Sequence, residues 1–224
     1  MIEIRDLRKM YQTGNTVVRA LDGVTTRIGD GEIVAVIGKS GSGKTTLLHA
    51  LGGMDVPAGG EIVVDGSEIT GKKEKELADY RLRKIGFVFQ FFHLIPVLTV
   101  KENLMLPLLI DGKPADEAYL SELIDILGLE EKLNVYPGQL SGGQKQRVAI
   151  GRAMVHKPGL LLADEPTGNL DSATAGEILD LLLGCAKRFD QTMVIVTHDM
   201  EVAGRCGRVL EISDGKIVGE HENR

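Results

Sequence analysis

The stretch Gly38-Lys39-Ser40-Gly41-Ser42-Gly43-Lys44-Thr45 decides the fold of this 224-residue chain. It follows the aliphatic run 33–37, typical of a strand buried on both faces, and it precedes a helix expected from about Thr45. The stretch matches G-x-x-x-x-G-K-[ST], in which glycines let consecutive backbone N–H groups point at an anion and the helix N-terminus adds positive potential. It therefore predicts a phosphate-binding loop, with Lys44 reaching the β and γ phosphates and the Thr45 hydroxyl as a Mg²⁺ ligand.

Two further aliphatic runs read as buried strands that end in polar residues. Residues 160–163 lead to Asp164 and Glu165, and residues 193–197 lead to His198. We expect Asp164 to hold Mg²⁺ through a water, and Glu165 to polarise the water that attacks the γ-phosphate. Buried strands alternating with helices predict an α/β fold, in which a parallel sheet carries helices on both faces.

The remaining segments add antiparallel strands and a helical insertion. Alternating residues in the first thirty positions predict short antiparallel strands with turns at residues 13–15 and at Asp22-Gly23. Charged residues at 72–84 predict a helix, and a further helix is expected to stop at Gly128. Residues 91–152 are predicted to form a helical insertion between two strands of the sheet.

Ser141-Gly142-Gly143-Gln144 allows two interpretations. Ser141 and Gln144 match a capping box, which opens a helix and needs no further role. The alternative is a second phosphate-binding helix N-terminus, where the two glycines allow close approach. Because the chain contains a single phosphate loop, a second phosphate-facing element indicates that this surface serves the ATP of another copy.

Composition limits the class of protein. Hydrophobic residues make up 43% and charged residues 26%, typical of a soluble globular chain, and no apolar run is long enough for a membrane span. The net charge of −6 argues against nucleic acid as the main partner. Two cysteines, Cys185 and Cys206, exclude a disulfide framework and favour a reducing compartment, where both are expected to be buried thiols. The N-terminus resembles a strand more than a signal peptide.

Taken together, these motifs resemble the nucleotide-binding subunit of an ATP-binding-cassette (ABC) transporter over nearly the whole chain. The resemblance implies a P-loop NTPase (RecA-like) parallel-sheet core, an antiparallel β subdomain and an inserted α-helical signature subdomain. Within a single domain, 1–224, it implies a core formed by 1–90 and 153–224, and a helical subdomain at 91–152.

The resemblance also implies roles for particular residues. Tyr11 stacks on adenine, or is otherwise a core residue at a strand end, and Asp171 crosses a dimer interface. Gln90 contacts Mg²⁺ and the attacking water. The expected catalytic residues are Glu165, His198, Gln90 and Lys44. The expected nucleotide-binding residues are Tyr11, Gly38, Lys39, Ser40, Gly41, Ser42, Gly43, Lys44, Thr45, Thr46, Ser141, Gly142, Gly143, Gln144 and Asp171. The expected metal ligands are Thr45, Gln90 and Asp164.

The same resemblance implies cofactors and partners. ATP and Mg²⁺ bind between two copies arranged head to tail, each ATP lying between one phosphate loop and the other copy's signature residues. An integral-membrane permease contacts residues 91–107, of which the apolar stretch 91–99 is otherwise explained as core packing. The chain is expected in the cytoplasm, peripheral on the cytoplasmic face of the cell membrane.

The motif set is similar to one ABC group, whose members drive lipoprotein release, macrolide or enterotoxin efflux, and antimicrobial-peptide detoxification. The alternative is a cell-division cassette that regulates an extracytoplasmic partner without transport. Chromosome-maintenance and DNA-repair cassettes carry a long coiled coil after the phosphate loop, and residues 46–139 hold no sustained heptads. Translation-factor cassette proteins carry two cassettes, and this chain has one.

Overall fold

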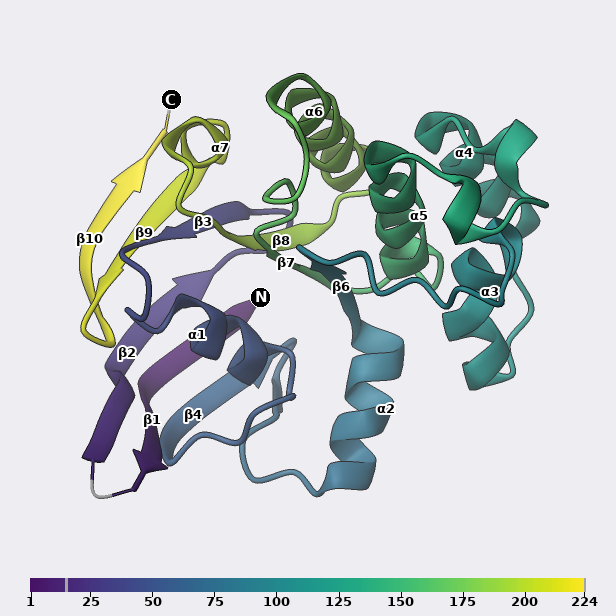
Figure 1. The fold of residues 1–224 in the computed structure, drawn as a ribbon. Helices are drawn as coiled ribbons and strands as arrows, with labels where there is room; N and C mark the ends of the chain where they lie inside the picture. The colour runs from purple at the N-terminus through teal and green to yellow at the C-terminus, as the bar shows by residue number, and fades with distance from the viewer. Residues whose placement is uncertain (15, 224) are drawn as a thin grey trace. The chain divides into compact units, whose positions relative to one another are not determined.

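The computed structural model describes residues 1–14 and 16–223, so Asn15 of the turn expected at 13–15 lies outside the described residues. The chain forms two compact units, which are traced in Figure 1. The first consists of Met1–Arg81 and Thr192–Arg224, and the second is Leu82–Gln191. The helical subdomain expected at 91–152 falls inside the second unit, and its boundaries stay a prediction.

An antiparallel sheet forms one layer of the first unit. Its strands in spatial order are β2 (Thr16–Ile28), β1 (Ile2–Thr13), β4 (Gly59–Val64) and β5 (Ser67–Glu68). The turn expected at Asp22-Gly23 is wrong, because β2 runs through both residues. The register steps from Leu7 opposite Val24 to Arg8 opposite Asp22, which makes Gly23 the extra residue of a bulge. Its φ of +89° is open to glycine, so the strand bends there without reversing.

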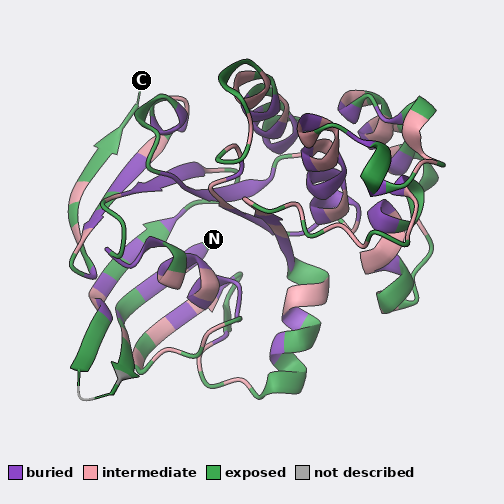
Figure 2. Ribbon diagram, viewed as in Figure 1, coloured by how far each residue is buried: buried purple, intermediate pink, exposed green. Residues whose placement is uncertain are grey.

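A parallel group of strands forms the other sheet of the first unit. Strand β3 (Ile33–Ile37) lies between β8 (Thr192–Val196) and β9 (Arg208–Ser213), parallel to both, and β10 (Lys216–Glu222) pairs antiparallel with β9. Figure 2 shows β3 and β8 buried along their whole length, as their continuous aliphatic sequence predicts. The helices of this unit are α1 (Lys44–Leu51) and α7 (Met200–Gly204).

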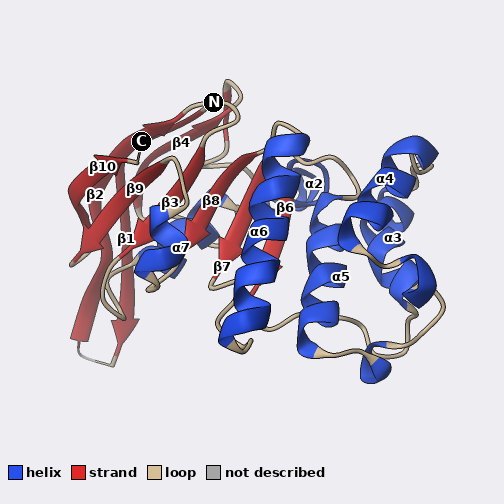
Figure 3. Cartoon of the chain, turned by 90° about the horizontal axis from the view of Figure 1, so that it is seen from above, coloured by secondary structure: helices blue, strands red, loops and turns tan. Residues whose placement is uncertain are grey.

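Helix α2 (Glu74–Lys84) begins two residues later than the predicted 72–84 and leads into the second unit. Two parallel strands, β6 (Ile85–Phe89) and β7 (Leu160–Asp164), form the sheet of that unit. The helices, which Figure 3 shows from above, are α3 (Val100–Asp111), α4 (Glu117–Leu127), α5 (Gly142–Met154) and α6 (Ser172–Arg188), with short 3-10 turns η1 (Glu130–Lys132) and η2 (Pro137–Gln139).

Polar caps set the limits of the helices in the second unit. A capping box of Thr99 and Glu102 opens α3, and the side chain of Asp116 accepts the backbone N–H of Tyr119 at the start of α4. As predicted, α4 ends at Gly128, whose φ of 62° is the left-handed conformation of a helix C-cap. Helix α5 packs against α3, α4, α6 and β6, and is the central helix of the unit.

Candidate nucleotide-binding site

The loop 38–45 joins β3 to α1, as the motif predicts. At two of its glycines, Gly38 and Gly43, the neighbouring backbone leaves no room for a side chain. A Cβ atom on Gly38, at a φ of +150°, would lie 2.1 Å from the carbonyl oxygen of Ile212, and one on Gly43 would lie 2.2 Å from that of Ala20. No side chain tolerates such distances. The loop therefore packs closely between β2 and the end of β9, and it leads directly into helix α1.

Two polar side chains are buried in this loop. Lys44 is 8% exposed, and its ammonium donates to the carbonyl oxygens of Gly38 at 2.8 Å and Lys39 at 3.0 Å. The hydroxyl of Ser42 is also buried, and it has no hydrogen-bond partner within the described part of the chain. A buried cation and a buried donor without a protein acceptor are what an anionic ligand requires. Lys39, Ser40, Gly41 and Thr45 are exposed, and Thr46 is half-buried.

Tyr11 is 40% exposed on β1, so its interpretation as a core residue is wrong. Its phenol donates to the carboxylate of Asp55 and also bonds to the side chain of Thr46, one residue after the phosphate loop. Lys9 pairs with the same carboxylate and donates to the carbonyl of Val56 at 2.7 Å. Partial burial and then the Asp55 bond raise the pKa of Tyr11. The phenol is thus held beside the loop, and Lys9 Nζ lies over the ring at 5.2 Å from its centroid.

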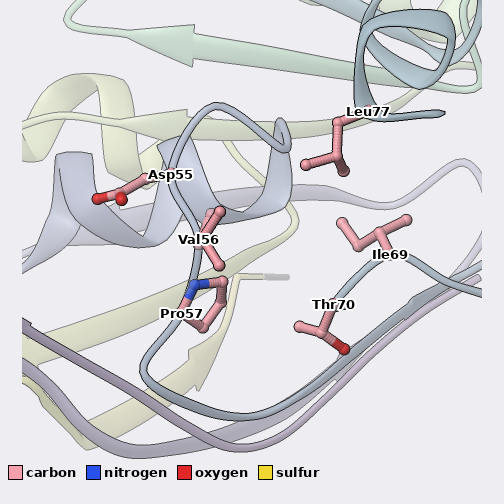
Figure 4. Close-up of a pocket in the computed structure, with 7 residues that line it drawn as sticks. Asp55, Val56, Pro57, Ile69, Thr70 and Leu77 are labelled. Atoms are coloured by element: carbon pink, nitrogen blue, oxygen red, sulfur yellow. The ribbon is translucent and has the colours of Figure 1, made fainter. Parts of the chain in front are cut away.

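Asp55 also borders a small pocket of the first unit. Figure 4 shows its lining, in which the aliphatic side chains of Val56, Ile69 and Leu77 face one another. The volume is about 10 Å³, which is near the lower limit for one water molecule. The pocket is too small for a nucleotide, so the phosphate loop remains the candidate site of this unit.

His198 follows β8 in an exposed turn of the first unit. Thr197, just before it, is buried, and its hydroxyl accepts the backbone N–H of Asp199 at 3.0 Å. The carboxylate of Asp199 in turn accepts the backbone N–H of Glu201 at 2.8 Å and caps α7. These bonds hold the backbone on both sides of His198 and present its imidazole to solvent.

Strands β6 and β7 bring the polar residues of the second unit together. Phe89 lies opposite Asp164 in the parallel register, so Gln90 and Glu165 follow at the same edge of the sheet. Glu165 has a φ of 46°, a strained conformation for a residue with a Cβ, and its carbonyl accepts the N–H of Gly168 at 3.0 Å. The chain therefore turns directly after Glu165, at the end of β7.

Gln90 has a partner that the sequence does not reveal. Its Nε2 donates to Asn169 Oδ1 at 3.3 Å, and Asn169 Nδ2 donates to the backbone carbonyl of Gln90 at 3.0 Å. Asn169 lies in the loop that leads to α6. The only sequence signal for it is its position two residues before Asp171.

Ser141 is the N-cap of α5, as the capping box predicts. Its hydroxyl accepts the N–H of Gln144 at 3.3 Å, and its own N–H donates to Gln144 Oε1 at 2.9 Å. Gly142 and Gly143 also serve contacts within the chain, because a Cβ on Gly143 would lie 2.6 Å from Thr174 Cγ2. Ser141 is exposed, and Gly143 is buried.

Asp171 is the N-cap of α6. Its carboxylate accepts the N–H of Thr174 at 3.1 Å, and this backbone bond lowers the pKa of Asp171. The side chain remains exposed. Two further polar residues, Gln146 and Arg152 on α5, contact the site loops and match no sequence motif. The signal for Gln146 is a polar residue four positions before the buried Ile150, on the core face of the helix.

Comparison with known proteins identifies the family. A family model described as ABC transporter matches residues 21–168. The lipoprotein-releasing system ATP-binding protein LolD of Legionella pneumophila is 46% identical over 94% of this chain and 94% of its own length. An uncharacterized ABC transporter ATP-binding protein of Thermotoga maritima is 45% identical over 98% of this chain and 94% of its own.

A solved structure agrees with this assignment. The ATP-binding cassette MJ0796, described as a dimer in a post-hydrolysis state bound to ADP and Pi, is 40% identical, with a TM-score of 0.89 over 100% of this chain and 99% of that one. No helix in the described part of the present chain combines the length and apolar character that a membrane crossing requires. The chain belongs to the ABC transporter family, and within it is an ATP-binding, ATP-hydrolysing subunit.

Proposed function

We propose that this subunit works as a head-to-tail pair of copies, and that each ATP lies between the phosphate loop of one copy and Ser141 of the other. The observation that carries the proposal is the N-terminus of α5. Ser141 is exposed there at the start of a 13-residue helix, with two glycines following it. The dimeric form of the related cassette MJ0796 supports the pairing of two copies.

Each half of the site has assigned tasks. In one copy, Lys44 and the N–H groups of the loop hold the β and γ phosphates, while Tyr11 stacks on adenine. Lys39, Ser40, Gly41, Ser42, Thr45 and Thr46 complete this phosphate and nucleotide contact. From the other copy, Ser141, Gly142, Gly143 and Gln144 approach the γ-phosphate, and Asp171 lies along the seam. Closure of the two copies therefore completes the cage around each triphosphate.

The residues present fit a Mg²⁺ ion. Thr45, Asp164 and Gln90 offer hydroxyl, carboxylate and amide oxygens, the hard ligands that Mg²⁺ prefers. Among the described residues, no group of three or more histidine, cysteine, aspartate or glutamate side chains is placed to hold a metal ion. When bound, the ion neutralises charge on the phosphate oxygens. Thr45, Asp164 and Gln90 are the residues that would hold it.

We assign the steps of hydrolysis to the chain's own groups. Glu165, at the end of β7, accepts a proton from the attacking water. His198 donates a hydrogen bond to the γ-phosphate, and Lys44 neutralises its developing charge. Release of phosphate removes the contact that joins the two copies, so the pair opens. Each cycle of ATP binding and hydrolysis therefore closes and then opens the pair of copies.

The motion is passed to a membrane permease, docked on residues 91–107. Phe91 and Val97 are 64% and 77% exposed there, so core packing does not explain the whole stretch. An open pocket of about 380 Å³ is lined by Phe91, Phe92, His93, Leu94, Pro96, Pro137, Gly138 and Lys145. Such an exposed apolar patch is typical of a protein interface. The LolD relatives support a permease of the lipoprotein-release type. We infer that the subunit binds this permease on the cytoplasmic face of the membrane.

The substitution Glu165→Gln tests this proposal. It keeps the shape of the side chain but removes the base, so ATP binding persists while hydrolysis falls by about 10²–10⁴-fold. The variant accumulates as an ATP-bound dimer, measured by size-exclusion chromatography with and without ATP. Glu130→Gln, at an exposed site in η1, is the matched control and hydrolyses ATP normally. A Glu165→Gln protein that stays monomeric with ATP contradicts the shared site.

A further inference from the structure

Gln146 is the one buried glutamine on helix α5, and it binds both the end of strand β6 and the loop that follows β7. It is fully buried, and its Nε2 donates to the carbonyl of Phe89 at 3.3 Å and to that of Pro166 at 2.7 Å. Phe89 immediately precedes Gln90, and Pro166 immediately follows Glu165. Both N–H groups of this amide therefore bind backbone next to a proposed catalytic residue.

The orientation of the Gln146 amide is fixed by these acceptors. If the amide were reversed, its oxygen would face two carbonyl oxygens. In the observed orientation, Oε1 is buried without a hydrogen bond from any described residue. A buried, half-satisfied amide is costly where an apolar side chain would fill the same volume. Gln146 therefore differs from an ordinary core residue by its two hydrogen bonds to backbone carbonyls.

Arg152 binds the backbone on the C-terminal side of Gln90, whereas Gln146 binds it on the N-terminal side. Its guanidinium donates to the carbonyl of His93 at 2.6 Å and to that of Phe92 at 2.8 Å. Burial lowers the pKa of Arg152, so the two carbonyl dipoles solvate a charge that has been partly removed from water. Arg152 lies six residues after Gln146 on α5. The helix thus holds residues 89–93, which we call the Gln90 loop, on both sides of Gln90.

We propose that Gln146 and Arg152 are positioning residues, which clamp the Gln90 loop to α5 so that Gln90 keeps a fixed position relative to Ser141 at the start of the same helix. The clamp makes one rigid body of two elements of the same copy that serve different nucleotides, because Gln90 acts on the ATP of its own phosphate loop and Ser141 on the ATP of the other copy. The clamp also joins the first residues of the stretch 91–107, where we place the permease, to helix α5, which has Ser141 as its N-cap. This inference rests on the proposed role of Gln90 at the metal and the attacking water.

The clamp predicts a specific kinetic defect. Gln146→Met fills the same volume but donates no hydrogen bond. Without the bond, the Gln90 loop samples other positions, and kcat falls by about tenfold while the KM for ATP changes by less than about twofold, because the phosphate loop is untouched. Gln191→Met is the matched control. It removes a buried amide whose Nε2 donates to the carbonyl of Phe189 at 3.3 Å, outside the Gln90 loop.

The decisive measurement is a double-mutant cycle with Gln90→Ala in the full chain. If Gln146 acts through Gln90, then Gln146→Met lowers kcat by less than about twofold once Gln90 is already alanine. An equal loss of kcat in both backgrounds overturns the clamp, as does a normal kcat for Gln146→Met alone. Gln90→Ala by itself separates the two ideas, because an unchanged kcat in that variant overturns the proposed role of Gln90 and not the contacts of α5.

The Arg152 end gives an independent test should Gln146→Met fail to fold. Arg152→Met removes both bonds, whereas Arg152→Lys keeps the charge but lacks the planar fork that reaches two carbonyls. We expect kcat to fall most for Arg152→Met and less for Arg152→Lys. Backbone hydrogen exchange should rise in residues 89–95 of both variants. Arg147→Met, on the same helix, removes a bond to the carbonyl of Leu127 and leaves that exchange unchanged. Unchanged exchange at 89–95 in Arg152→Met overturns the proposal.

Discussion

Gln90 and Asn169 are joined by two hydrogen bonds, although 79 residues separate them in the chain. One bond connects the two side-chain amides, and the other runs from the Asn169 amide to the Gln90 backbone. Gln90 follows β6, and Asn169 lies in the loop after β7 that also contains Glu165. The pair therefore links the two loops that carry the residues proposed to act on the attacking water.

Asn169→Leu should slow hydrolysis without weakening nucleotide binding. The substitution removes both bonds to Gln90, and a loss of about 1 kcal/mol of orientation corresponds to an about fivefold lower kcat. Steady-state ATPase assays measure kcat and KM together. Asn134→Leu, at an exposed position, is the control and should have normal kinetics. A raised KM with normal kcat would contradict a role in orienting Gln90.

Lys44→Ala should lose nucleotide affinity. The ammonium is held by two loop carbonyls, and we expect its remaining N–H to bind a phosphate oxygen as a charge-assisted hydrogen bond. Its removal should weaken ATP binding by about 10- to 100-fold, measured by isothermal titration calorimetry. Lys84→Ala, exposed at the end of α2, should bind ATP normally. Unchanged affinity for Lys44→Ala would exclude the phosphate-loop assignment.

Asp55→Ala should weaken binding of the adenine base alone. Asp55 anchors the phenol of Tyr11, so its loss frees the ring that we place on adenine. Affinity for ATP should fall about three- to tenfold, whereas affinity for tripolyphosphate, which has no base, should stay the same. Asp79→Ala, exposed on α2, serves as the control. Equal losses for the two ligands would show general damage to the unit.

Phe91→Asp should abolish recruitment to the membrane while leaving the fold intact. The ring is 64% exposed, so the substitution costs little in the isolated subunit but places a charge in the proposed apolar interface. The measurement is the fraction of subunit that sediments with membranes of the source cells. Met200→Asp, also exposed, is the control at a site outside the proposed interface. Normal sedimentation of Phe91→Asp would place the permease elsewhere.

Cys185 should resist alkylation in the native protein. Burial raises the pKa of its thiol from 9.0 to about 11. Because only the thiolate reacts, and a higher pKa leaves less of it, about one thousandth is thiolate at pH 8. Iodoacetamide labelling followed by mass spectrometry should be slow at pH 8 and rise with pH toward the raised pKa. In urea, where the pKa returns to its ordinary value, labelling should be fast; equally fast labelling without urea would contradict the burial.

Features encoded by neighbouring residues were predictable. The phosphate loop, the buried strands and the capping box at Ser141 depend on motif spacing and on periodicity, and the structure confirms where each forms. Gly23 shows the limit of this approach. A glycine preceded by aspartate favours a turn, yet pairing of β2 with β1 on both sides makes it a bulge. Local preference was outweighed there by the sheet.

By itself, the sequence determined the family of the chain and the places where the predicted phosphate loop and the capping box form, because these short segments depend on backbone geometry set within a few residues. Only the tertiary structure decided how the site residues are supported. The bonds from Gln146 to Phe89, from Tyr11 to Asp55 and from Gln90 to Asn169 span 57, 44 and 79 residues. Such contacts depend on strand register and helix packing, which bring distant residues together without leaving a local pattern.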